Sequence, residues 1–301
     1  MNAQPPHREK GFILVVVLWI LAALAALASS YSTYVSNSAI ASKVNDDRLA
    51  AEAAIMSSLE LTAYELISSP QEARPKSGEL SFRLSGADVI AHFISERARA
   101  DINVAPKDLL AGLFRQIGVD SSRADFYADR IIAWRQKWTD ASQDLEPMAY
   151  KAEGFGYSPR EGPFQSVMEL GIVRGIPPEI VDKIIPFVTV YNGGDSVDPF
   201  LARPEIIAAL PGMTPQSTSE VLSQRALDPN NNLALFEKLG PARARVSTES
   251  SKAIRIFTQV HLKNNRRISA ETVIFLRENS DGEPYRVLYW QDDFDGLNDR
   301  R

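Results

Sequence analysis

One uncharged apolar stretch dominates the hydropathy pattern of the chain. It begins at Phe12, continues for 17 residues, and is followed by uncharged residues to Tyr34. A membrane-spanning helix needs about 20 apolar residues, with a lower limit near 17. Because Arg8 and Lys10 precede the stretch, the positive-inside rule puts that end in the cytoplasm. We predict a single-pass transmembrane segment at 12–34; a secretory signal peptide removed after the apolar run is the alternative.

The predicted helix extends far beyond the bilayer. No Pro or Gly interrupts the chain between Phe12 and Ser69, and Pro70 stops the helix there. At 1.5 Å per residue a helix over 12–69 is about 85 Å long, much more than a bilayer needs. Its second half carries an apolar stripe among charged residues, so we expect that half to pack on a soluble domain. A Pro- and Gly-containing linker, 70–78, follows.

Alternating apolar and polar residues predict strands on both sides of a long central region. The alternating runs are 79–84, 88–102, 252–262, 267–277 and 285–291. Turn residues separate the last three runs, which predicts an antiparallel meander. The expected sheet therefore consists of 79–103 and 252–291, followed by a polar tail at 292–301.

The central region, 104–251, has helical periodicity and almost no strand signal, which predicts a helical domain inserted into the sheet. Its predicted helices are 107–116, 122–136, 166–173, 178–188, 204–210 and 216–225. Gly118, Gly175 and Gly212 each follow a helix, where Gly suits a left-handed cap. These turns resemble helix-hairpin-helix modules, which bind DNA phosphates. Their Asp and Pro residues favour ordinary helical hairpins instead, since phosphate binding needs a basic neighbourhood.

Composition excludes several classes of protein. The 301 residues include no Cys, which excludes disulfides, iron–sulfur clusters, Cys-ligated zinc and a thiol nucleophile. The net charge of −5 argues against a protein that coats nucleic acid. The sequence also lacks a nucleophile elbow, a P-loop and a dinucleotide fingerprint. We therefore predict no enzymatic activity and no nucleic-acid partner.

The junction before the apolar stretch resembles a type IV prepilin leader. It reads Lys10-Gly11-Phe12. The resemblance implies that a prepilin peptidase removes the leader, 1–11, by cutting after Gly11, and that it methylates the new N-terminus at Phe12. Members of this family usually have Glu at the fifth mature position, where this chain has Val16. Absence of that Glu is a feature of the K-type minor pseudopilins of type II secretion systems.

The central region carries a closer resemblance to the same K-type family. The similar segments are ADINVAPKDLLAGLF (100–114), FQSVMELGIVRGIPPEIVDKIIPFVTVY (164–191) and LARPEIIAALPGM (201–213). The resemblance implies an α+β, pilin-like fold, in which a long N-terminal helix packs on a small antiparallel sheet with a large helical domain inserted between the strands. It implies a minor pseudopilin in the inner membrane, with its soluble domain in the periplasm.

The family resemblance also implies a place and partners. The protein is expected at the pseudopilus tip, where it would help to initiate assembly. Its expected partners are the I-type and J-type minor pseudopilins, the prepilin peptidase and membrane lipid.

Three carboxylates in one stretch are a candidate calcium site. Asp140, Asp144 and Glu146 lie close together after Trp138, and oxygen-rich loops of this kind hold Ca²⁺. Some K-type proteins are thought to bind calcium in this domain. The family often has closely spaced Asp soon after a Trp, whereas here Trp134 is followed by Arg, Gln and Lys. A plain solvated loop is therefore the alternative.

Three other functions stay open from the sequence. A minor pilin of a type IV pilus would have the same leader. A membrane-anchored DNA-binding or DNA-uptake protein would use the Gly turns, and a membrane-anchored periplasmic hydrolase would use the loop carboxylates with a metal ion.

Overall fold

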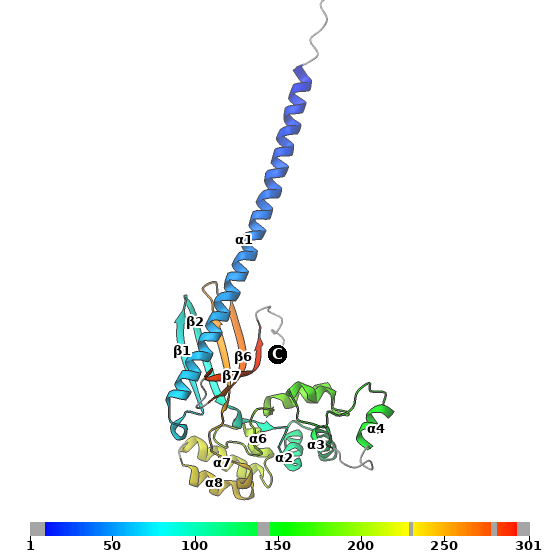
Figure 1. The fold of residues 1–301 in the computed structure, drawn as a ribbon, viewed down its shortest axis with the longest axis vertical. Coiled ribbons are helices and arrows are strands. Elements are labelled where there is room, and N and C mark those ends of the chain that lie inside the picture. The colour runs from blue at the N-terminus through cyan, green and yellow to red at the C-terminus, as the bar shows by residue number, and fades with distance from the viewer. Residues whose placement is uncertain (1–9, 138–144, 229–230, 278–281, 294–301) are drawn as a thin grey trace, which may run out of the picture.

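The computed structural model describes residues 10–137, 145–228, 231–277 and 282–293. The helix α1 (Lys10–Ser68) forms one continuous rod of 59 residues, and Pro70 follows its end. Its first part projects alone from the molecule (Figure 1), with every described side chain from Phe12 to Asp46 exposed. This helix is long and apolar enough to cross a membrane, and its most apolar window is entirely uncovered.

The second half of α1 lies on one sheet. The sheet has the strand order β1-β2-β5-β6-β7, and all neighbours are antiparallel. The strands are β1 (Ser77–Leu84), β2 (Ala87–Ser95), β5 (Ala253–His261), β6 (Arg267–Leu276) and β7 (Tyr285–Asp292). Since β2 and β5 are direct neighbours, everything between them in the chain is an insertion. The predicted fold class is therefore confirmed.

The helix and the sheet share two small apolar cores. Leu59, Ala63 and Leu66 of α1 pack with Phe93 and Ile256 of the strands. One to two turns earlier, Ala51, Ala54 and Ile55 pack with residues at the other end of the sheet. These positions recur every three to four residues, as one buried helix face requires. Between the two cores, the buried hydroxyls of Ser58 and Thr258 share a hydrogen bond of 2.7 Å.

The inserted domain has a separate and larger core. Its α-helices are α2 (Lys107–Gln116), α3 (Ser121–Arg135), α4 (Leu145–Ala152), α5 (Pro178–Ile184), α6 (Pro204–Ala209), α7 (Pro215–Leu227) and α8 (Asn232–Leu239). Short 3-10 helices join them: η2 (Glu96–Ala98), η4 (Val167–Ile172), η5 (Ile185–Phe187) and η6 (Gly240–Arg245). The domain lies at the end of the sheet farthest from the apolar part of α1 (Figure 1).

The Gly turns of the inserted domain have the conformation that their sequence predicts. Gly118, Gly175 and Gly212 have φ values of 89°, 81° and 81°, the left-handed region that side chains rarely adopt. At Gly175 an added Cβ would also lie 2.7 Å from the ring of Phe126. These glycines end helices and let the next helix pack back on the same core.

Several predicted boundaries differ from the structure. The run predicted as one strand over 88–102 is broken after Ser95, whose hydroxyl accepts a hydrogen bond from the Arg97 amide and starts η2. The next strand, β3 (Ala100–Asp101), leaves the large sheet and pairs in parallel with β4 (Val188–Thr189).

Other helices and the last strand also depart from the predicted pattern. The helix expected over 166–173 is the 3-10 helix η4, and α4 and α8 were not predicted. At the end of the chain, β7 continues to Asp292, and Asp293 accepts hydrogen bonds from the amide and hydroxyl of Ser269. The start of the expected polar tail thus belongs to the sheet.

Candidate functional site

The apolar end of α1 carries the residues that the leader motif predicts. Gly11 and Phe12 lie in the first turn of the helix, and Phe12 is 73% exposed. Val16, one turn further, is also exposed. Cleavage after Gly11 and methylation of Phe12 stay predictions. An uncovered apolar rod of this length is costly in water, so it requires lipid or the helices of other subunits around it.

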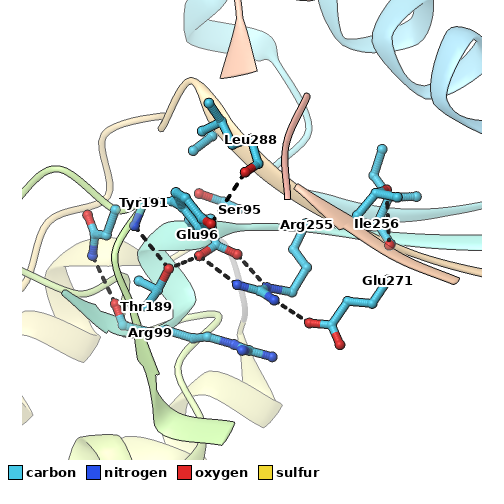
Figure 2. Close-up of polar contacts among 12 residues, drawn as sticks. Ser95, Glu96, Arg99, Thr189, Tyr191, Arg255, Ile256, Glu271 and Leu288 are labelled. Atoms are coloured by element: carbon cyan, nitrogen blue, oxygen red, sulfur yellow. Dashed lines mark hydrogen bonds and ion pairs between the residues drawn. The ribbon is translucent and has the colours of Figure 1, made fainter. Parts of the chain in front are cut away.

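A buried ion pair joins the sheet to the inserted domain (Figure 2). The Arg255 side chain on β5 donates from Nε to Glu96 Oε1 at 2.6 Å and from Nη2 to Glu96 Oε2 at 3.1 Å. Arg255 also donates from Nη1 to Glu271 on β6, and the Thr189 hydroxyl on β4 donates to Glu96. Glu96 is 1% exposed and fully paired, so η2, β4 and β5 meet at its carboxylate, and β6 joins them through Arg255.

The electrostatics of this junction favour the charged form of the arginine. Burial opposes the positive charge of Arg255, but the adjacent carboxylates of Glu96 and Glu271 outweigh burial and raise its pKa. Removing one partner of a buried ion pair of this kind lowers the free energy of unfolding by several kcal/mol, because the other charge is left buried without compensation. The junction therefore fixes how the inserted domain starts from the sheet.

Further polar contacts hold the entry and exit of the inserted domain. The fully buried Asp198 accepts a hydrogen bond from Lys76 Nζ at 2.8 Å, which ties the domain to the segment before β1. Asp101 accepts from the amides of Asn103 at 2.9 Å and Gly193 at 2.8 Å. Burial raises the pKa of Asp101 in spite of these two amides.

Of the three predicted calcium ligands, only Glu146 lies in the described part of the chain. It is buried, and its carboxylate accepts a hydrogen bond from Arg130 and lies 3.5 Å from Arg174 Nη2. Asp140 and Asp144 lie outside the described residues. Within the described ranges, no group of three or more His, Asp or Glu side chains is placed to hold a metal ion. Calcium at these residues stays a prediction.

The sequence did not single out the residues of the junction. Asp198 forms a turn, in which its Oδ1 accepts a hydrogen bond from the Phe200 amide at 2.9 Å, and it is also the buried ion-pair partner of Lys76. One local signal for the junction exists: Arg255 stands between Ile254 and Ile256 in an apolar strand, where an unpaired charge would be costly. Its partner Glu96 lies 159 residues away in the chain, so no local pattern connects the two.

Part of this chain matches a known protein family. Residues 90–193, which include most of β2 together with Glu96 and Thr189, match the family model described as type II secretion system (T2SS), protein K. No curated protein matches the chain significantly.

A solved structure has the same fold. It is a chain of the crystal structure of the GspK-GspI-GspJ complex from the type 2 secretion system of enterotoxigenic Escherichia coli. The two are 15% identical and superpose with a TM-score of 0.60, over 82% of this chain and 98% of that one. Residues 90–193 therefore resemble the protein K family of the type II secretion system, as the sequence predicted, and the chain shares its fold with a chain of that complex.

Proposed function

We propose that this protein occupies the tip of the pseudopilus and helps to initiate its assembly. The observation that carries the proposal is the position of the inserted domain, at the end of the molecule opposite the apolar part of α1 (Figure 1). In a filament built from packed N-terminal helices, that end faces the next subunit along the axis. A domain of this size fills the space that another subunit would need.

The apolar helix supports the same place. In the pilin family the Glu at the fifth mature position is thought to pair with the N-terminal amine of a neighbouring subunit, which offsets the cost of a carboxylate at bilayer depth. This chain has Val16 there, and its first charged residue after Phe12 is Lys43. It offers no such contact to a subunit above it, and a subunit at the top needs none.

The proposed role is structural, and the proposed partners are the I-type and J-type minor pseudopilins. The solved structure that shares the fold is a complex with GspI and GspJ. The small residues of the α1 stripe, which include Ala22, Ala23 and Ala26, allow close approach of neighbouring helices in the membrane. We place the apolar segment in the inner membrane and the sheet and inserted domain in the periplasm. Processing by prepilin peptidase after Gly11 belongs to the same proposal.

The proposal is tested in cells that lack the gene. We expect loss of secretion of type II substrates, restored by the full chain, with twitching and adhesion unchanged. The full chain, extracted in detergent, should co-purify with the I-type and J-type subunits. A twitching or adhesion defect with normal secretion would favour the type IV pilus alternative. Tight binding of DNA at low salt in a filter assay would favour the DNA-uptake alternative.

A further inference from the structure

A cavity lies between the sheet and the inserted domain, beside the Glu96–Arg255 pair. Its volume is about 150 Å³. The sheet and the inserted domain both contribute to its wall, with Arg99 on the segment that joins them. Polar side chains of the wall are Arg99, Ser166, Tyr191, Arg255, Glu271, Tyr289 and Gln291. Space of this size admits a small organic molecule or one inserted side chain.

Arg99 is the polar group of this wall whose hydrogen-bonding capacity is unused. Its half-buried guanidinium makes no hydrogen bond or ion pair with any described residue, and Figure 2 shows it extending without a dashed contact. The neighbouring Arg255, in contrast, donates to Glu96 and Glu271. Burial, and after it the positive charge of Arg255, lowers the pKa of Arg99 to about 10. The charged guanidinium is thus partly desolvated without the hydrogen bonds that usually compensate for burial.

Arg99 lies among charges of both signs. The carboxylates of Glu96 and Glu271 favour its charged form, and the cations Arg255 and Arg203 oppose it. Both carboxylates already accept hydrogen bonds from Arg255, so neither is available in full to Arg99. A further negative group in the cavity would accept the hydrogen bonds that the Arg99 guanidinium does not make.

We propose that this cavity binds a carboxylate, held by the guanidinium of Arg99 and bridging the sheet and the inserted domain. The planar guanidinium matches a carboxylate in a two-bond fork. Ser166 also lines the cavity, and its hydroxyl, which accepts a hydrogen bond from the Met168 amide, can donate a further one. The carboxylate belongs either to a free small organic acid or to an acidic side chain of a neighbouring protein; the chemistry of recognition is the same.

The first arm of the test uses acetate and glutarate as probes on the full chain in detergent. We expect each to raise the unfolding temperature relative to chloride at equal ionic strength. Arg99→Gln should weaken the apparent affinity for the probe about tenfold, the loss of one charge-assisted contact. Arg99→Lys should recover part of the affinity, since it keeps the charge and loses the fork. Arg83→Gln, an exposed arginine on β1, is the matched control and should change nothing.

The second arm distinguishes the source of the carboxylate, and it alone rests on the proposed partners. If neither probe shifts the unfolding temperature, but Arg99→Gln releases the I-type or J-type subunit in co-purification while Arg83→Gln does not, the carboxylate is a partner's side chain. If the probes fail and Arg99→Gln co-purifies like the original chain, the proposal is overturned. A normal circular dichroism spectrum of Arg99→Gln excludes misfolding as the cause, and Arg99→Lys repeats the comparison if Gln does not fold.

Discussion

The stability of the protein depends strongly on single charged residues at the junction between the sheet and the inserted domain. Glu96 is buried and accepts three hydrogen bonds from Arg255 and Thr189, so its charge is compensated only in the folded arrangement. We predict that Glu96→Gln lowers the free energy of unfolding by about 3 kcal/mol, because Arg255 loses its main counter-charge. Urea unfolding measures the change. Glu79→Gln, on an exposed side chain, is the control, and a loss below about 1 kcal/mol at Glu96 would contradict the assigned role.

Two buried tyrosines predict a loss of stability at alkaline pH. Burial raises the pKa of Tyr150 to about 12, and burial with the carboxylate of Glu60 raises that of Tyr285 to about 12. An unfolded tyrosine ionises near pH 10. Between about pH 10 and 12 the unfolded state therefore holds fewer protons than the folded one, so stability falls as pH rises through that window.

The tyrosine variants test this dependence directly. Tyr150→Phe should cost about 1 kcal/mol at pH 7, because its oxygen accepts a hydrogen bond from the Arg174 amide at 2.7 Å. It should also flatten the decline in stability above pH 10, measured by urea unfolding at several pH values. Tyr64→Phe, on an exposed side chain, should leave the decline as it is. An unchanged slope in Tyr150→Phe would show that other groups dominate the alkaline transition.

The leader motif predicts cleavage after Gly11 and methylation of Phe12. Peptidases of this kind act at a Gly, and we expect Gly11→Val to leave the precursor unprocessed. Mass spectrometry of the original chain should find a methylated Phe12 as its first residue. Asn2→Ser, a change in the leader away from the junction, should leave processing intact. A mature N-terminus at another position would refute the prepilin assignment.

At the scale of elements, α1 serves two environments along its length. Its first half is exposed for lipid or other helices, and its second half has one apolar face against the sheet. We predict that Leu59→Ala destabilises the protein by about 2–5 kcal/mol, because the side chain is fully buried between α1 and the sheet. Leu61→Ala, two residues away and 43% exposed, is the control. Urea unfolding distinguishes them, and equal losses would contradict the packing of this helix face.

At the scale of the whole molecule, the pairing of β2 with β5 predicts that the inserted domain can be deleted without disturbing the sheet. Ser95 and Ile254 are direct partners in the β2–β5 pairing, so a two-residue turn can replace residues 96–253 without moving either strand. We predict that joining Ser95 to Ile254 through Asn-Gly leaves a folded α1 and sheet, shown by circular dichroism and resistance to protease. Secretion should be lost, since the domain proposed to cap the filament is gone. Retained secretion would contradict the proposed function.

The sequence by itself determined the elements whose signal is local. The uncharged stretch from Phe12 specifies the apolar helix, alternation specifies the strands, and Gly118, Gly175 and Gly212 specify left-handed turns. A helix or strand shows its buried face as a period of 3.6 or 2 residues, which can be read without knowing the partner. Short elements such as η4 and α8 lack enough periods for this, and they were missed or misassigned.

Only the tertiary structure decided which distant side chains meet. The pairing of β2 with β5 brings Glu96 to Arg255, and the parallel pairing of β3 with β4 brings Thr189 to the same carboxylate. A polar residue in the sequence shows that it needs a partner when buried, but it does not show which one. That choice depends on strand register and on how the inserted domain returns to the sheet, which local patterns do not encode.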